Sequence, residues 1–366
     1  MAIPCASALL DNTHVALRRC WHPVALASEI GPQPTRVLLL GEAYACWRVA
    51  GRVVAFVDRC PHRGAPLSMG GRVGDTLRCA YHGWRFGADG TCEAIPALGE
   101  GAHLPSRARL VAPAAVREHL GLVFLAPEPP LAALPEIPEA TDATFAMGVL
   151  PPTRTRGSAG LLADNFLDFA HFPFLHANTF GAEESAEIAP YTLRRDGFDF
   201  EVVYEHPFQN REDPGVRSGL RPLVQTRRMT YRFRVPFALG LRLEFLEAGG
   251  VNTIGFFLQP ETADTVRCYT ILWRNDLDGD LARLEAALAF EQQVLDEDLA
   301  LQSRYERLAL SLEMHDEVHT RADRITVELR RVLADLVARS DDLHRKGARG
   351  ACGVPSSPEA EVLDAI

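Results

Sequence analysis

Two long stretches of the chain alternate short apolar runs with polar or glycine-containing turns, which is the pattern of β-strands. The first extends from about residue 21 to 126 and includes "TRVLLLGEAYACWRVAGRVVAFVDRC", with Gly41 and Gly51 at its turns. The second, from about 190 to 275, contains five strand-like runs typical of an antiparallel sheet with one solvated face. We therefore expect a small all-β domain followed by a larger sheet.

Helical periodicity appears in two other places. The segment "GSAGLLADNFLDFAHFPFLHANTF" begins as a helix and then breaks. Residues 278–313, "DGDLARLEAALAFEQQVLDEDLALQSRYERLALSLE", predict one long amphipathic helix. Its apolar stripe comprises Leu281, Leu284, Leu288, Leu295 and Leu299. The pattern as a whole indicates an α+β chain.

These elements divide the chain into domains. Residues 127–152 hold seven of the 25 prolines, which predicts an extended linker. We expect one domain over residues 20–126, before the linker, and a second over residues 153–340, after it. Residues 341–366 show little periodicity and are predicted to form a loose tail.

Composition and charge narrow the function. A formal net charge of −10 disfavours a nucleic-acid partner, because such proteins present basic patches. No apolar run approaches the length of a membrane span, and the first residues lack the pattern of a signal peptide, so we expect a cytoplasmic protein. The eight cysteines are too sparse for a disulfide scaffold in a chain of 366 residues. Clustered Cys and His residues therefore point to a metal or to catalysis.

One such cluster lies in "CPHRGAPLSMGGRVGDTLRCAYHGWRF" and contains Cys60, His62, Cys79 and His82. Tetrahedral zinc is one interpretation of two cysteines and two histidines. However, the gap from Cys60 to His62 is too short for an ordinary zinc knuckle, and no finger helix follows. A Rieske [2Fe–2S] cluster, which has two cysteines on one iron and two histidines on the other, fits the spacing better.

The sequence closely resembles a Rieske iron–sulfur domain. The resemblance rests on the C-x-H-x16-C-x2-H pattern, with "GAPL" after the first pair and Gly83-Trp84 after the second. It implies that Cys60, His62, Cys79 and His82 are the cluster ligands. A Rieske cluster carries only electrons, so another site must use them.

The candidate for that site is "DNFLDFAHFPFLH", residues 164–176. Asn165, Asp168 and His171 are spaced three apart, which predicts that they lie along one face of a helix. His176 would point away from that face in a regular helix. Pro173 is expected to kink or end the helix, so that both imidazoles can face one point.

Two histidines and one carboxylate form the facial triad of non-haem Fe(II) oxygenases. A pair of buried core histidines is the alternative for His171 and His176. The segment is similar to the N-x2-D-x2-H-x4-H motif of Rieske non-haem iron oxygenase α subunits, at all four positions. The single-chain length and this stretch look more like the monooxygenase and demethylase branch of that family.

The third iron ligand is expected in "EQQVLDEDLALQ", where Asp296, Glu297 and Asp298 are candidates. The family places this aspartate in a late helix after an acidic residue or Gln, which favours Asp298. The resemblance also implies a role for Asp168. That carboxylate would bridge His82 of one subunit and His171 of the next, and would carry the electron between the two centres.

The resemblance covers residues from about 21 to 335 and implies an N-terminal Rieske domain and a C-terminal helix-grip domain, in which an antiparallel sheet wraps a long helix. It further implies a homotrimeric ring, a [2Fe–2S] cluster, a mononuclear Fe(II), and electrons from NAD(P)H through a separate reductase or ferredoxin. The expected reaction uses O2 to hydroxylate or oxidatively demethylate an aromatic or polycyclic small molecule. A Rieske electron carrier and a zinc-stabilised helix-grip binding protein remain as alternatives.

Overall fold

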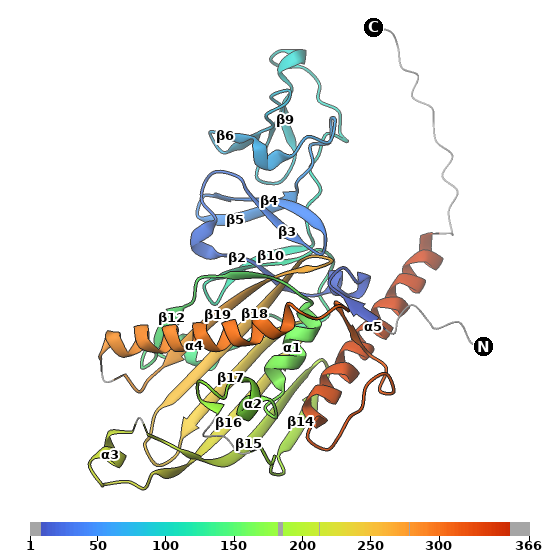
Figure 1. Ribbon diagram of the computed structural model, residues 1–366. Helices are drawn as coiled ribbons and strands as arrows, with labels where there is room; N and C mark the ends of the chain where they lie inside the picture. The colour runs from blue at the N-terminus through green and yellow to red at the C-terminus, as the bar shows by residue number, and fades with distance from the viewer. Residues whose placement is uncertain (1–8, 182–185, 212, 278, 352–366) are drawn as a thin grey trace, which may run out of the picture.

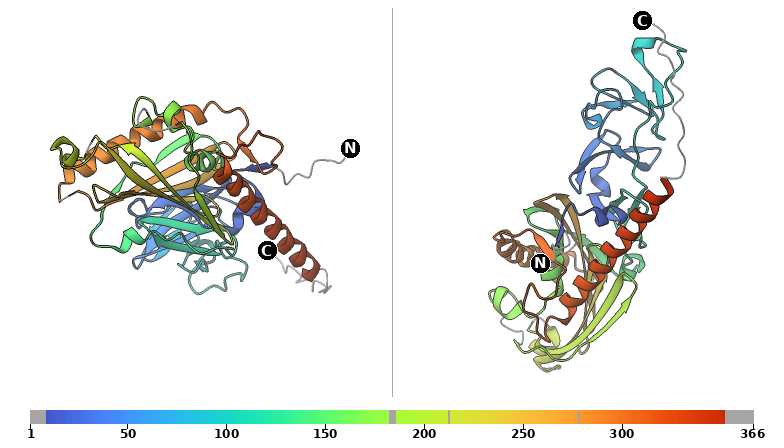
Figure 2. Two further views of the ribbon diagram at one scale, coloured as in Figure 1. Left: turned by 90° about the horizontal axis from the view of Figure 1, so that it is seen from below. Right: turned by 90° about the vertical axis from the view of Figure 1, so that its right-hand side faces the viewer.

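The computed structural model describes residues 9–181, 186–211, 213–277 and 279–351. The molecule is elongated, with a small β-lobe at one end and a larger lobe of sheet and helices at the other (Figures 1 and 2). This is the expected α+β arrangement of two domains. No helix within the described ranges has the length and apolarity needed to cross a membrane.

The small lobe contains three antiparallel sheets. The strands are β2 (His22–Leu26), β10 (Ala115–His119) and β11 (Leu122–Ala126) in the first, β3 (Thr35–Leu39), β4 (Glu42–Val49) and β5 (Arg52–Val57) in the second, and β6 (Gly71–Val73), β7 (Thr76–Arg78), β8 (Arg85–Phe86) and β9 (Cys92–Ala94) in the third. Trp47, Leu67 and Phe86 are fully buried in the core beneath the Cys/His loops. The lobe is all-β, as expected, and its last strand ends at Ala126.

The large lobe is built on one eight-stranded antiparallel sheet, ordered β12-β19-β18-β17-β16-β15-β14 with β13 also paired to β19. Its strands are β12 (Ala146–Val149), β13 (Thr153–Arg156), β14 (Thr192–Asp196), β15 (Asp199–Gln209), β16 (Val224–Arg234), β17 (Ala238–Phe245), β18 (Val251–Thr262) and β19 (Thr265–Arg274). The helices are α1 (Ala159–Leu167), α2 (Phe172–Leu175), α3 (Pro214–Arg217), α4 (Leu281–Gln302) and α5 (Arg324–Ala351). The long helix α4 lies across the sheet beside α1 (Figure 1).

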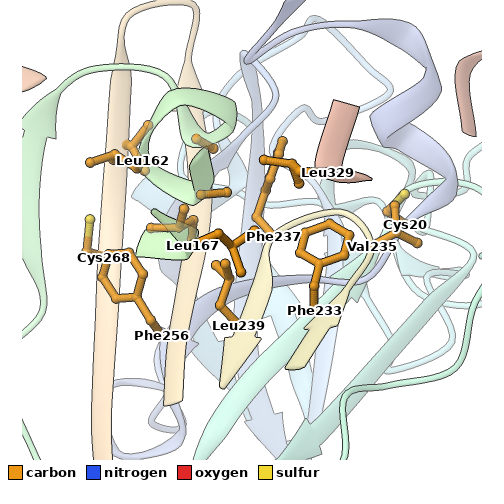
Figure 3. Packing of buried hydrophobic residues seen from close by; sticks show 14 of the residues in the cluster. Cys20, Leu162, Leu167, Phe233, Val235, Phe237, Leu239, Phe256, Cys268 and Leu329 are labelled. Atoms are coloured by element: carbon orange, nitrogen blue, oxygen red, sulfur yellow. The ribbon is translucent and has the colours of Figure 1, made fainter. Parts of the chain in front are cut away.

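The sheet and α1 share a core that continues into the small lobe. Leu162 and Leu167 of α1 face Leu239 and Phe256 of the sheet (Figure 3). Backbone hydrogen bonds also join the lobes, from Leu40 N–H to the carbonyl of Pro260 (2.8 Å). The two lobes are therefore packed together by a continuous buried surface.

Three expectations about element ends were wrong. The segment 127–152 is not a free extended linker, because residues 138–141 form a 3-10 helix and β12 within the segment pairs with β19, which satisfies backbone groups of both strands. The long helix ends at Gln302, well before residue 313, and residues 309–311 instead form β20, which pairs with β1 (Leu9–Asp11).

The third incorrect expectation was that residues 341–366 form a loose tail. Helix α5 continues past residue 341 to Ala351. Contacts one turn apart extend it, including the ion pair of Lys346 with Asp342 (2.9 Å). Residues 352–366, the rest of the expected tail, lie outside the described residues.

Candidate metal centres and substrate cavity

The two Cys/His loops of the small lobe share one hydrogen-bond pattern. In each loop the cysteine N–H donates to the carbonyl five residues later, and the cysteine carbonyl accepts from the glycine N–H four residues later. These bonds are Cys60 N to Ala65 O (2.8 Å), Gly64 N to Cys60 O (2.9 Å), Cys79 N to Trp84 O (2.9 Å) and Gly83 N to Cys79 O (3.1 Å). Gly64 and Gly83 have φ of 74° and 71°, a conformation that other residues adopt with strain.

The loops place cysteines inside and histidines outside. Cys60 and Cys79 are buried, whereas His62 and His82 are exposed at the tip of the lobe. The two imidazole rings lie 4.5 Å apart, centre to centre. Trp84 stacks on His62 with an interplanar angle of 7°, which holds that ring in place.

This donor set fits a two-iron cluster better than a single zinc ion. A tetrahedral zinc needs all four ligand atoms within bonding distance of one point. Among the described residues, the four Cys and His donors do not converge within 4.8 Å, while another group does. Burial raises the pKa of the Cys60 thiol to about 11, so its thiolate needs a bound cation. Partial desolvation by its neighbours, together with His82 and Arg63, lowers the pKa of His62, and a neutral imidazole is the form that binds a metal.

The second constellation does not lie on one helix, contrary to expectation. Helix α1 ends at Leu167, and Asp168 adopts an extended conformation with φ −84° and ψ 118°. The Asp168 carboxylate accepts the N–H of Ala170 (2.8 Å), and this local turn competes with the helix. Pro173 does not kink α1; it lies in the first turn of α2, where its missing N–H costs nothing.

The break brings three donor atoms together. His171 Nε2 and His176 Nε2 lie 3.2 Å apart, and Asp298 Oδ1 of α4 lies 3.6 Å from the first and 3.4 Å from the second. They form the one group of three or more potential ligands within 4.8 Å that the described residues contain. The structure thus brings together the two histidines and the favoured aspartate.

Hydrogen bonding leaves these donor atoms with lone pairs facing one another. His171 Nδ1 lies 3.3 Å from Asp168 Oδ2, and His176 Nδ1 lies 2.7 Å from Glu297 Oε2. If each Nδ1 carries the proton, both Nε2 atoms present lone pairs across 3.2 Å. Asp298 Oδ1 is buried and has no hydrogen-bond partner. Three facing lone pairs repel unless a cation lies between them, so the residues fit a metal ion.

The electrostatic field of the site also favours a cation. Burial by itself lowers the pKa of His176, but the negative charges of Asp298 and Glu297 outweigh burial and raise it. Thr179 Oγ1 donates to Glu297 Oε2 (3.1 Å) and fixes that carboxylate. Asp296 points elsewhere, is exposed, and accepts from Gln292 (2.9 Å).

Glu297 thus contacts the outer nitrogen of His176, whereas Asp298 approaches the inner one. The sequence offered all three residues of the acidic run 296–298 in α4 as candidates. The rotation of α4 relative to α2 decides that Asp298 faces both imidazoles and that Glu297 contacts only Nδ1 of His176.

A cavity of about 1050 Å³ opens beside these donors. Its walls are mainly aromatic and aliphatic, from α1, α2, α4 and the concave face of the sheet. They include Phe166, Phe172, Phe180, Met229, Leu241, Phe256 and Phe290. Asn165, in the last turn of α1, also lines the cavity, and its carbonyl accepts the N–H of Asp168 (3.1 Å). Five arginines are among its lining residues, namely Arg211, Arg221, Arg227, Arg274 and Arg283. The cavity thus combines apolar walls with polar and charged groups, and such a cavity is suited to a small organic molecule with polar substituents.

The two constellations lie far apart within one chain. The Cys/His loops are at the tip of the small lobe near β6 and β9, while α2 lies in the large lobe (Figures 1 and 2). The Asp168 side chain is 32% exposed in the single chain, although its neighbour His171 is largely buried.

Comparisons with known proteins agree with this organisation. Residues 20–112 match the Rieske [2Fe-2S] domain family, and residues 155–339 match the family described as the vanillate O-demethylase oxygenase C-terminal domain. The chain is 27% identical to methylxanthine N1-demethylase NdmA of Pseudomonas putida over 93% of its own length and 94% of the relative's.

Solved structures show the same fold. NdmA of Pseudomonas putida CBB5 with caffeine superposes with a TM-score of 0.77 at 24% identity, covering 96% of this chain and 99% of that one. Dicamba monooxygenase bound to 3,6-dichlorosalicylic acid superposes with a TM-score of 0.77 at 20% identity. The match covers 89% of this chain and 98% of that one.

The paired loops, the converging donors and these matches point to one conclusion. A [2Fe–2S] domain is joined to an oxygenase domain of the kind that uses mononuclear iron, O2 and electrons from a reductase. The chain belongs to the Rieske non-haem iron oxygenases, as an α (oxygenase) subunit of their monooxygenase and demethylase branch.

Proposed function

We propose that this oxygenase removes a methyl group from the oxygen or nitrogen of an aromatic or heterocyclic small molecule. The observation that carries the proposal is the convergence of His171, His176 and Asp298 on the wall of the apolar cavity. Support for demethylation comes from the matched oxygenase domain and from relatives that are N-demethylases.

In this proposal His171, His176 and Asp298 hold the mononuclear Fe(II), and Cys60, His62, Cys79 and His82 hold the [2Fe–2S] cluster. The small lobe over residues 20–126 and the large lobe over residues 153–340 act as the electron-transfer and catalytic domains. When bound, the iron supplies O2 activation with electrons that arrive through the cluster.

The residues of the chain position the reaction. Phe166, Phe256 and the other apolar walls exclude water and hold the ring, while Asn165 limits the approach to the iron. One oxygen atom of O2 enters a methyl C–H bond, and the other leaves as water after taking up two electrons and two protons. The resulting hydroxymethyl group loses formaldehyde and leaves the O–H or N–H of the product.

Asp168 is proposed to connect the centres of two subunits. Its carboxylate lies 3.3 Å from His171, and its exposed part is available to a neighbouring subunit. Because the cluster loops lie far from α2 of the same chain, His82 of a second copy is the suitable partner (Figure 1). Head-to-tail contacts of this kind close into rings, and we propose a homotrimer. The buried free cysteines suit a reducing cytoplasm, where a reductase or ferredoxin is the electron source.

The experiment is a single turnover of the chemically reduced, fully metallated protein with O2 and a methylated compound. The panel consists of vanillate, dicamba, caffeine and theobromine. The proposal predicts formaldehyde in equal amount to the demethylated product for at least one of these compounds. Reduced protein that consumes O2 and forms a ring-hydroxylated product, with the methyl group retained, would contradict demethylation.

A further inference from the structure

One face of α4 forms a wall of the cavity and carries a second acidic residue. Besides Asp298, this helix contributes seven lining residues, namely Arg283, Ala286, Ala287, Phe290, Glu291, Val294 and Leu295. Glu291 precedes Asp298 by seven residues, close to two full turns, so the two lie on one face with their Cα atoms about 10 Å apart along the axis. Glu291 therefore faces the same cavity at a distance from the proposed iron.

The other carboxylates of the cavity are already engaged. Asp213 Oδ2 accepts from Arg221 Nε at 2.7 Å. Asp276 accepts two N–H groups of Arg274 at 2.9 and 2.6 Å. Asp298 converges with the two histidines.

Glu291 differs from these three. Within the part of the chain that the structure describes, no hydrogen bond or ion pair joins its carboxylate to another side chain. Of the five arginines that line the cavity, Arg274 acts most strongly on Glu291, and its guanidinium is bound to Asp276. Its own helix places Ala287, Val294 and Leu295 around it, all apolar and one turn away.

An unpaired carboxylate in such surroundings is unfavourable. Burial raises the pKa of Glu291 to about 7, against the opposing effect of Arg274. An apolar side chain of similar size would avoid this cost, and Leu or Met would maintain the helix equally well. A carboxylate becomes favourable here when a ligand in the cavity supplies a hydrogen-bond donor or a positive charge.

We propose that Glu291 anchors the substrate by binding an ammonium or N–H group on the α4 wall of the cavity, about two helical turns from the iron. This inference rests on the proposed function, because the methyl group must lie at His171, His176 and Asp298. The substrate class is then an aromatic O- or N-methyl compound with a basic or N–H nitrogen on the far side of the ring. An anionic group next to Glu291 is repelled by the same carboxylate.

Three compounds that share the 4-methoxyphenyl group and differ in the charge of the side chain test the charge preference. They are 4-methoxyphenethylamine (cation), 4-propylanisole (neutral) and 3-(4-methoxyphenyl)propanoate (anion). Dissociation constants are measured by calorimetry, without O2, on the full-length protein with both metal centres loaded. The wild type is compared with E291Q, which preserves shape and removes the charge, and with D296N, which removes an exposed charge from the same helix outside the cavity.

The proposal predicts that the wild type and D296N bind the amine ~10-fold or more tightly than 4-propylanisole, and that E291Q loses this preference. Equal binding of the amine and the neutral compound by the wild type would overturn it. Tightest binding of the propanoate would also overturn it, since Arg274 would then control recognition. The proposal would likewise be overturned if E291Q kept the full preference for the amine over 4-propylanisole.

Binding and turnover separate this inference from the function on which it rests. If the charge preference is absent but formaldehyde still forms from these methoxy compounds, only the role of Glu291 fails. If E291Q removes the preference but the bound methoxy group is never demethylated in the reduced wild type, the anchor stands and demethylation fails.

Discussion

The Nδ1 atom of His176 lies 2.7 Å from Oε2 of Glu297. The other nitrogen of the same ring lies 3.4 Å from Oδ1 of Asp298, so consecutive residues of α4 engage both sides of one imidazole. Glu297 accepts the Nδ1–H and thereby fixes the tautomer in which Nε2 keeps its lone pair for a metal. A negative charge at this position also increases the basicity of the ligand nitrogen.

Substitution of Glu297 should therefore weaken iron binding without removing a ligand. We expect E297Q to raise the dissociation constant for Fe(II) by ~10-fold and E297A by ~100-fold, since Gln still accepts a hydrogen bond. Competition with a chelator of known affinity measures both values. D296N is the matched control and should bind iron as the wild type does. Wild-type affinity in E297A would show that His176 is oriented by something else.

Asp168 should affect electron transfer more than metal content. In D168N the amide keeps the shape of the side chain but loses the charge that faces His171 at 3.3 Å. We expect unchanged iron and sulfide, and a rate of cluster reoxidation by O2 in the presence of substrate that falls ~10- to 100-fold. Stopped-flow absorbance of the reduced cluster gives this rate. D142N, at an exposed aspartate of the segment between the lobes, is the control. A rate equal in D168N and D142N would refute the electron path through Asp168.

The charge of Glu291 should make binding of a cationic ligand depend on pH. Its pKa is raised to about 7 by burial, so the carboxyl is mostly neutral at pH 6 and mostly ionised at pH 8. Arg274 of β19, His176 after α2 and Asp298 of α4 are the charged groups that act on it. We expect the dissociation constant of 4-methoxyphenethylamine to fall ~10-fold from pH 6 to pH 8 in the wild type.

Two controls isolate this effect. E291Q should show no such change with pH, and neither should 4-propylanisole with the wild-type protein. Because all of these samples share the titrations of the metal site, an equal pH dependence in each would assign the effect to the iron ligands and remove Glu291 from the explanation.

Arg330 of α5 should be important for stability. Its side chain is 3% exposed and donates to Asp164 Oδ2 of α1 (3.0 Å) and to Glu317 (2.6 Å). R330M leaves the Asp164 carboxylate, whose side chain is 23% exposed, without its partner, so we expect the free energy of unfolding to fall by ~3 kcal/mol. R331A removes an exposed cation from the next position and should lower the free energy of unfolding by less than ~1 kcal/mol. Urea unfolding measures both, and a loss of the same size in each would contradict the buried pair.

Sequence patterns predicted the two lobes and indicated the Cys and His candidates, because both depend on local spacing, whereas the family resemblance favoured Asp298. Strand alternation and the Cys-x-His and Cys-x2-His pairs can be read within a few residues. The end of α1 could not be predicted from such local patterns. The carboxylate of Asp168 accepts the N–H of Ala170 and ends the helix before Pro173 is reached. The strand at residues 146–149 was also missed, since its partner β19 lies more than a hundred residues later.

The division of roles within the α4 acidic run depended on tertiary structure in the same way. Glu297 and Asp298 are adjacent in sequence and chemically alike. Their different positions follow from the rotation of α4 against α2, which no local pattern encodes. Glu291 gave no signal at all, because a glutamate in an amphipathic helix is ordinarily solvated. Only the tertiary structure shows that Glu291 lines the cavity.

The central claim is that the chain holds a mononuclear iron at His171, His176 and Asp298, separate from its [2Fe–2S] cluster. Iron and sulfide analysis with EPR, on anaerobically purified wild type and D298A, tests it most directly. We predict about three irons and two sulfides per wild-type chain, and about two of each in D298A with an unchanged Rieske signal after reduction. Three irons retained in D298A, or zinc without sulfide in the wild type, would contradict it.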